Sequence, residues 1–352
     1  MSLVRLVVAS AACLALLGCA GAPEVPRHTE SAATTTSPLQ DRDARFGLPK
    51  DPDSSRTSLS GVWLGGRMST GDLEQFATWR GARVETVTTY VAYDTWADMK
   101  NAWTISTFDG FPGTLVYGLA LLPTREKGSL QDVVDGKHDD VWHAVAANLR
   151  LHSRQRSIVR IGLEANGTWF PWGATAVTAQ TFKDAYRRVA GILRQQLPEV
   201  LLGFDITCAV GLKGDADRLA PLTVLYPGDD VVDIVGCDIY DDRSHDVSGG
   251  QYQALTRFAK GPGLLDIADF ARARGKPMAV PEWGLDAVLG KKDNPDFISA
   301  MHRFFVDHPG EVLFENYFNE PGTTLKSSLW DPVNNPESSR VYRSLWRTDE
   351  TG

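Results

Sequence analysis

Eight short apolar stretches, rich in β-branched residues, alternate with amphipathic stretches between residues 61 and 346 of this chain. Apolar runs of this length indicate buried strands, and the patterns between them indicate helices. The predicted strands are 61–66, 82–91, 113–122, 157–164, 199–208, 231–240, 276–282 and 311–318. The predicted helices are 70–80, 139–152, 178–196, 263–274, 294–307 and 342–346, with a helical turn at 94–101. This alternation predicts an α/β fold built on a parallel sheet.

A single (β/α)8 TIM barrel over residues 59–352 fits both the number of strands and the length of this region. The alternative is an open, doubly wound sheet. Many such sheets bind nucleotides through a Gly-x-Gly-x-x-Gly motif after the first strand, and that motif is missing from the sequence here. We therefore expect a barrel, in which functional side chains lie at the C-terminal ends of the strands.

Residues 1–18 have the pattern of an export signal. A basic start is followed by an apolar run at 6–17, which is too short to span a bilayer. The sequence Leu16-Leu17-Gly18-Cys19 resembles a bacterial lipobox, which implies cleavage before Cys19 and lipidation of its thiol. An ordinary secretory signal with an incidental cysteine is the alternative. We expect an exported protein, lipid-anchored to the outer face of the bacterial cell membrane or else secreted.

Residues 19–58 are rich in Pro, Ser, Thr and charged residues, which predicts a flexible tether. Beyond the tether, the barrel region contains Cys208 and Cys237. In an exported protein this pair could form a disulfide, and two buried free thiols are equally compatible with the sequence.

The composition narrows the range of partners. Apolar residues make up 43% of the chain, enough for a sizeable core, and the net charge of −8 provides no electrostatic basis for binding nucleic acid. The cysteine spacing fits no metal site. The sequence implies neither a metal nor an organic cofactor. We expect the domain to act as a monomer.

The segment from Arg160 to Gly173 has the strongest functional signal. Its predicted strand leads to Glu164, which is followed closely by Asn166, Trp169 and Trp172. Such surroundings predict a partly desolvated carboxyl group with a raised pKa. The flat indole rings suit the apolar faces of sugar rings.

A second carboxylate, Glu282, stands in Pro281-Glu282-Trp283-Gly284 at the end of the predicted seventh strand. The fourth and seventh strands of a barrel face each other across its mouth. Two opposed carboxylates suit glycoside hydrolysis, in which one is protonated and the other ionised. A surface acid after a proline is the alternative for Glu282.

Together these motifs resemble glycoside hydrolase family 26, a family of retaining (β/α)8 glycosidases. The matching residues are Arg160, Glu164, Asn166-Gly167, Trp169 to Gly173, Tyr226 to Asp229, Val232 to Gly236, Asp238, Tyr240 and Pro281 to Gly284. The resemblance covers roughly residues 61–346 and is most specific around Glu164.

The resemblance implies that Glu164 is the acid/base and Glu282 the nucleophile. It also implies that Tyr240 donates a hydrogen bond to the nucleophile and that Arg160 holds Glu282 ionised. A core aromatic is the alternative for Tyr240, and a structural ion pair is the alternative for Arg160. The candidate substrate-binding residues are Arg160, Asn166 and Tyr240, together with the candidate sugar-stacking residues Trp63, Trp169, Trp172, Trp283 and, more weakly, Trp330.

One position departs from the family pattern. The family usually places His before the acid/base Glu, whereas this chain has Leu163. We expect a polysaccharide substrate, with β-1,4-mannan first and β-1,3-xylan or mixed-linkage β-glucan as further family substrates. A surface glycan-binding lipoprotein that has lost catalysis is the alternative, favoured by Leu163 and opposed by the two carboxylates.

Replacing the lipidated thiol tests the anchor. A Cys19→Ser variant should leave the membrane fraction because it cannot accept lipid, while the activity of the barrel stays unchanged. Fractionation followed by immunoblotting measures this. A variant that remains with the membranes would contradict the lipobox interpretation.

Overall fold

The computed structural model describes residues 48, 50, 56–242, 246–290 and 292–348. The chain divides into two units, Met1–Thr36 and Ser37–Gly352, and all the described residues belong to the second. The export signal at 1–18, Cys19 and most of the 19–58 tether lie outside the described residues.

Eight parallel strands close into one barrel, in the order in which they occur in the chain. They are β1 (Leu59–Trp63), β2 (Thr86–Tyr90), β3 (Thr114–Leu119), β4 (Ile158–Ile161), β5 (Leu201–Thr207), β6 (Ile234–Asp241), β7 (Met278–Leu285) and β8 (Val312–Phe318). The last strand pairs with the first, in a register that places Gly61 beside Asn316. The prediction of a TIM barrel is therefore confirmed.

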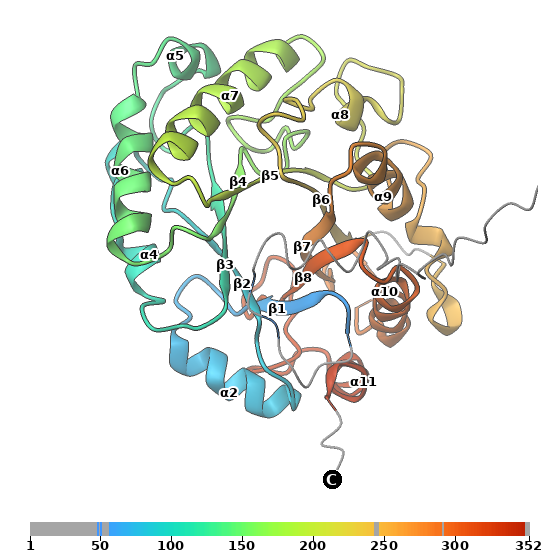
Figure 1. Ribbon diagram of the computed structural model, residues 1–352. Coiled ribbons are helices and arrows are strands. Elements are labelled where there is room, and N and C mark those ends of the chain that lie inside the picture. Colours follow the sequence, from blue (N-terminus) through green and yellow to red (C-terminus); the bar gives the residue numbers. More distant parts are fainter. Residues whose placement is uncertain (1–47, 49, 51–55, 243–245, 291, 349–352) are drawn as a thin grey trace, which may run out of the picture. The chain divides into compact units, whose positions relative to one another are not determined.

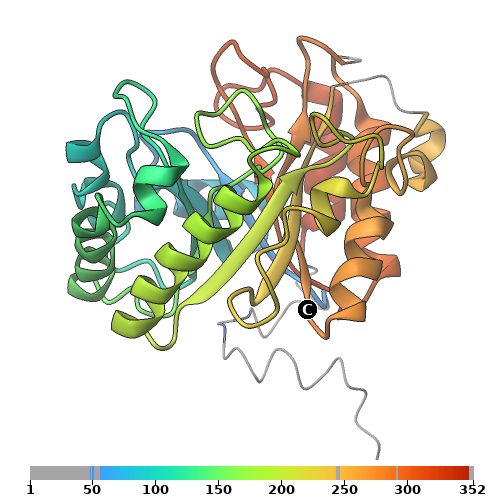
Figure 2. The same ribbon diagram turned by 90° about the horizontal axis from the view of Figure 1, so that it is seen from above.

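Helices surround the strands, as the view along the barrel shows (Figure 1) and the turned view repeats (Figure 2). They are α2 (Thr70–Arg80), α3 (Trp96–Met99), α4 (Trp103–Ser106), α5 (Leu130–Val134), α6 (Asp139–Leu151), α7 (Ala179–Gln196), α8 (Ala220–Thr223), α9 (Leu264–Ala273), α10 (Pro295–Asp307) and α11 (Pro336–Trp346), with 3-10 turns η1 (Ser248–Gly250) and η2 (Gln253–Leu255). Among the described residues, no helix is both long and apolar enough to cross a lipid bilayer.

Several boundaries differ from those predicted, and three of the differences are larger or concern the candidate glutamates. The strand β4 ends at Ile161, so Glu164 lies in the following loop. The strand β7 continues past Glu282 as far as Leu285. The helix α11 begins at Pro336, ahead of the predicted 342–346, because the fixed φ of proline suits the first turn of a helix.

The barrel interior changes character along its axis. At the N-terminal ends of the strands the interior is apolar, with Leu59, Val116, Ile158, Ile234, Ala279, Leu313 and Phe314 packed in one cluster. Two positions further along β4 the buried side chain is Arg160, and further along β6 it is Asp238. The strands therefore have a packed lower layer and a polar upper layer, which places the chemistry at the C-terminal mouth.

Cys208 and Cys237 form a disulfide that joins the end of β5 to β6, with their Cα atoms 5.6 Å apart. The structure thus decides between the two states that the sequence left open. The bond closes a loop with a sequence separation of 29 residues. Cys208 directly follows Thr207, and Cys237 directly precedes Asp238. The bond therefore links two adjacent strands close to the mouth of the barrel.

Removing the disulfide should lower the stability of the barrel. For a Cys208→Ser, Cys237→Ser variant we expect a loss of about 2–4 kcal/mol in the free energy of unfolding, because the cross-link restricts the unfolded chain. Urea denaturation measures this. Dithiothreitol should destabilise the wild type by a similar amount and leave the variant unaffected, and equal sensitivity of the two proteins would contradict the expectation.

Candidate active site

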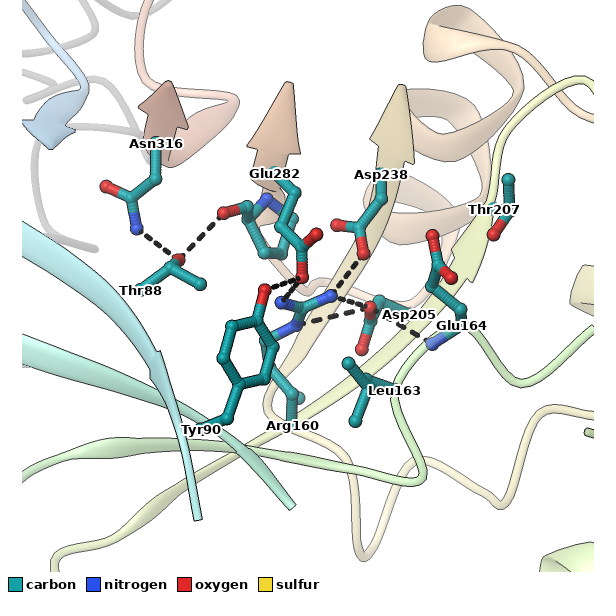
Figure 3. A network of polar contacts seen from close by, with 12 residues as sticks. Thr88, Tyr90, Arg160, Leu163, Glu164, Asp205, Thr207, Asp238, Glu282 and Asn316 are labelled. Carbon is teal, nitrogen blue, oxygen red and sulfur yellow. Dashed lines mark hydrogen bonds and ion pairs between the residues drawn. The ribbon is translucent and has the colours of Figure 1, made fainter. Parts of the chain in front are cut away.

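Arg160, on β4, lies at the centre of the mouth and is almost completely buried. Its guanidinium contacts carboxylates from the next three strands: Asp205 on β5, Asp238 on β6 and Glu282 on β7 (Figure 3). Its Nη1 donates to Oε1 of Glu282 at 2.6 Å, and its Nε donates to Oδ2 of Asp205 at 3.2 Å. A buried guanidinium requires such partners because its desolvation is costly.

The four charges of this cluster do not cancel, since one arginine faces three carboxylates. Burial raises the pKa of Asp205, and it raises that of Asp238 still further from the ordinary value, although Arg160 opposes both changes. The charge of Glu282 adds to both increases. The cluster therefore favours taking up a proton on these aspartates.

Glu282 accepts three hydrogen bonds. Besides Arg160, the hydroxyl of Tyr90 donates to Oε1 at 2.6 Å, and the hydroxyl of Tyr240 donates to Oε2 at 2.9 Å. The predicted contacts of Arg160 and Tyr240 with Glu282 are thus present in the structure, and Tyr90 adds a donor that sequence reasoning missed. Three donors on two oxygens stabilise a carboxylate and fix its orientation.

An irregularity in β7 directs Glu282 into the mouth. Between the pairs Gly236–Ala279 and Ile239–Trp283, β7 contains one residue more than β6. Pro281 lies in this bulge, where its missing N–H cannot serve the ladder. The carbonyl of Pro281 accepts a hydrogen bond from Thr88 Oγ1 on β2 at 2.8 Å, across the barrel (Figure 3).

Tyr90, the last residue of β2, reaches Glu282 because β3 provides space for its ring. A Cβ atom added to Gly118 would lie 2.5 Å from Cδ1 of Tyr90. The position of Tyr90 near the end of a predicted strand was the signal that could have identified it.

Glu164 lies in a tight turn after β4. Gly162 has a φ of +59° and Glu164 itself has a φ of +49°, a left-handed conformation that non-glycine residues rarely adopt. The turn leaves Glu164 9% exposed, with Oε2 accepting a hydrogen bond from Trp169 Nε1 at 3.0 Å. Strain of this kind persists only where the surroundings hold it, and it concentrates at functional sites.

Burial, together with the nearby charge of Glu282, raises the pKa of Glu164 to about 7. The hydrogen bond from Trp169 opposes this rise, and burial outweighs it. One carboxyl group of the mouth is therefore protonated near neutral pH, and the other is held by three donors. When the surroundings of two carboxyl groups favour different protonation states, one group can act as an acid and the other as a base or nucleophile.

Two of the predicted substrate-binding residues instead support the Glu164 loop. The amide of Asn166 donates to the carbonyls of Thr207 and Val210 and accepts from the Thr207 N–H, so its polar atoms are occupied. Trp172 is fully buried, stacks on Phe170 and donates to the carbonyl of Leu163. The prediction that these two side chains face the substrate is therefore corrected.

The remaining tryptophans occupy different environments. Trp169 is 56% exposed at the mouth. Trp63 is half-buried, stacked on Phe318 with ring centroids 3.9 Å apart. Both indoles therefore remain candidates for stacking on a sugar.

Trp283 and Trp330 do not fit the predicted stacking role. Trp283 is fully buried on the outer side of β7, where its Nε1 donates to Glu315 and its ring packs beside Trp346. It points away from the mouth because side chains alternate along a strand and Glu282 points inward. Trp330 packs edge-on against Phe76 of α2, on the outer wall.

Asp205 is a further residue that sequence reasoning missed. It is a charged residue in the middle of the predicted apolar strand 199–208, and this placement was an available signal. In the described part of the chain, no group of three or more His, Cys, Asp or Glu side chains is arranged to hold a metal ion.

Comparison with known proteins agrees with this geometry. Residues 132–282, which include both glutamates, match the sequence profile of glycosyl hydrolase family 26. Over these residues the chain is similar to glycoside hydrolase family 26. The match excludes the first part of the barrel and the region after Glu282.

Two curated proteins are similar to this chain. A mannan endo-1,4-beta-mannosidase of Bifidobacterium adolescentis is 36% identical over 168 residues, covering 45% of this chain and 16% of that protein. Endoglucanase H of Acetivibrio thermocellus is 21% identical over 294 residues, covering 80% of this chain and 30% of that protein. The chain therefore spans less than a third of the length of either relative.

A solved structure of a family 26 β-mannanase from Bacteroides ovatus superposes with a TM-score of 0.60 at 14% identity, covering 88% of this chain and 92% of that one. At this level of identity the likeness concerns the fold alone.

The raised pKa of Glu164 predicts a pH-dependent stability. The folded protein retains this proton up to about pH 7, whereas the unfolded chain releases it near the ordinary value of 4.5. The free energy of unfolding should therefore fall by about 3 kcal/mol, relative to Glu164→Gln, as the pH rises from 4.5 to 7. Gln removes the buried charge, so the variant should match the wild type at pH 4.5 and exceed it in stability at pH 8.

Urea denaturation at several pH values measures the difference between the two proteins. Glu74→Gln, an exposed change on α2, serves as the control and should follow the wild-type curve. A constant difference between the wild type and Glu164→Gln across this range would contradict the assignment of the proton to Glu164.

Proposed function

We propose that this protein is a retaining endo-β-glycanase that hydrolyses a β-linked polysaccharide, with β-1,4-mannan as the first substrate to test. The observation that carries the proposal is that two carboxyl groups in one barrel mouth have different surroundings. Glu282 accepts three hydrogen bonds, and the pKa of Glu164 is raised to about 7. Double displacement needs one ionised carboxylate and one carboxylic acid.

In the first step, the carboxylate of Glu282 attacks C1 of the sugar while Glu164 gives its proton to the departing glycosidic oxygen. Arg160, Tyr90 and Tyr240 hold the Glu282 carboxylate in place before the attack. The ester that forms is neutral, and the negative charge is left on Glu164, which has given up its proton. The leaving chain departs as an alcohol, and the sugar remains on Glu282.

In the second step, Glu164 is ionised and takes a proton from water as the water oxygen attacks C1. The ester bond breaks, Glu282 regains its charge and Glu164 regains its proton. Two inversions at C1 leave the β configuration unchanged. Carboxyl groups about 5–5.5 Å apart suit this route, while about 6.5–9.5 Å suits inversion.

The choice of mannan rests on the named activity of the Bifidobacterium relative, and endoglucanase H keeps β-glucan in the test. Leu163, almost completely buried, occupies the position where the family usually has His. A difference at this position affects contacts near the reacting sugar more than the two-glutamate chemistry. Export and a lipid anchor on Cys19 would place the enzyme where it meets polymeric glycans.

The test combines substrates with the two glutamate variants. The purified barrel is incubated with β-mannan, β-1,3-xylan and mixed-linkage β-glucan, and new reducing ends are measured. The first product should have the β configuration by proton NMR. Glu282→Ala should abolish turnover, because the covalent intermediate cannot form. Binding without new reducing ends would favour the glycan-binding alternative, and an α product would exclude retention.

Glu164→Ala should behave differently from Glu282→Ala. Cleavage of polysaccharide should fall by about 10²–10⁴-fold, since its leaving group needs a proton. The first step on a dinitrophenyl β-glycoside should survive, because that leaving group is already a good one. Azide should then restore turnover and yield a β-glycosyl azide, and the absence of that product would remove Glu164 from the acid/base role.

A further inference from the structure

We propose that Asp205 is the positioning residue that fixes Glu164 relative to Glu282. Its side chain lies between the loop that carries the acid/base and the arginine that holds the nucleophile (Figure 3). This inference rests on the proposed function and adds to it a residue that contacts neither the sugar nor the reacting atoms.

On one side, Asp205 holds the strained turn. Its Oδ2 accepts a hydrogen bond from the backbone N–H of Glu164 at 3.4 Å, and its carbonyl accepts one from the N–H of Ala165 at 3.1 Å. These two contacts bracket the residue whose φ is +49°. Because a left-handed glutamate is unfavourable by itself, contacts of this kind determine where its carboxyl group lies.

On the other side, Asp205 orients Arg160. The same Oδ2 accepts from Nε of Arg160 at 3.2 Å and also from its Nη2. The far end of that guanidinium, Nη1, bonds Oε1 of Glu282 at 2.6 Å. One oxygen atom of Asp205 therefore connects the backbone of the acid/base to the side chain of the nucleophile through a single arginine.

The arrangement indicates a positional role. Asp205 is 1% exposed, and all its side-chain contacts converge on Oδ2, while Oδ1 has no hydrogen-bond partner among the described residues. The contacts therefore depend on where one acceptor oxygen lies. An amide oxygen at the same place can accept the same bonds, whereas a longer side chain would move the oxygen.

Asp266 provides a matched control on the outer wall. It is 4% exposed and accepts from Arg218, Arg257 and the backbone N–H of Gly263, so its burial and its partners resemble those of Asp205. It lies on α9 and contacts neither glutamate. Substitutions at Asp266 therefore measure how disturbing a buried ion pair affects the stability and activity of the barrel when neither glutamate is contacted.

The test compares Asp205→Glu, which keeps the charge and moves the oxygen, with Asp205→Asn, which keeps the oxygen and removes the charge. Each is paired with the same change at Asp266. Asp205→Glu should lower kcat on the polysaccharide about 10²-fold, because small misplacements of catalytic groups cost this much, and should leave KM within about threefold. Asp205→Asn should stay within about tenfold of the wild type.

Two readouts separate positioning from a purely structural role. On the dinitrophenyl glycoside, Asp205→Glu should lose much less activity than on the polysaccharide. In a Glu164→Ala background, Asp205→Glu should lower activity much less than it does in the wild type, because the acid/base that it displaces is gone and only its contact with Arg160 remains to be disturbed. Equal losses on both substrates, additive losses in the double variant, or a larger loss for Asp205→Asn than for Asp205→Glu would overturn the proposal.

Crystal structures of the Asp205→Glu and Asp266→Glu variants test the geometry independently of any activity. The first should show the Glu164 carboxyl shifted relative to Glu282, and the second should not. An unshifted Glu164 in the first variant would overturn the positioning role. Absence of wild-type turnover on every glycan would instead overturn the proposed function, and the two failures are therefore distinguishable.

Discussion

The burial of one guanidinium, that of Arg160, is the constraint on which the rest of the mouth depends. A fully buried arginine is unfavourable unless carboxylates surround it, and here they come from the next three strands. Meeting that requirement brings Asp205, Asp238 and Glu282 together at the top of the barrel. The apolar layer below them provides the rigid base on which this polar cluster stands.

Each glutamate occupies an irregular part of the backbone. Glu282 lies at a bulge formed around a strand-interior proline, and Glu164 lies in a left-handed turn begun by a glycine. A regular strand would alternate its side chains and could not turn a carboxylate to an arbitrary direction. The bulge and the turn allow the two carboxyl groups to point in other directions. A hydrogen bond from Thr88 holds the bulge, and a hydrogen bond to Asp205 holds the turn.

The same arrangement separates the protonation states of the two carboxyl groups. Donors surround Glu282, whereas burial and the charge of Glu282 leave Glu164 holding a proton to about pH 7. At neutral pH the mouth therefore lowers the stability of the fold, because Glu164 either retains a proton that the unfolded chain would release or is a buried charge beside that of Glu282. Such a cost to stability is common where function requires a shifted pKa.

The sequence by itself determined the barrel and the main actors. The alternation of eight apolar runs with helices predicted the fold, and strand-end reasoning with the family resemblance identified Glu164, Glu282, Arg160 and Tyr240. These signals are local, because burial and periodicity are written in consecutive residues.

Tertiary structure decided what depends on the direction of a side chain. Trp283 and Trp172 are buried as packing residues, and the side-chain amide of Asn166 bonds to backbone carbonyls. The disulfide and the roles of Tyr90 and Asp205 were likewise decided by tertiary structure, because they arise from contacts between strands distant in the sequence. In a regular strand, side chains alternate between two faces, so the sequence predicts which residues share a face. A bulge or a strained turn shifts that alternation. Where the bulge and the turn occur is decided by the closed barrel.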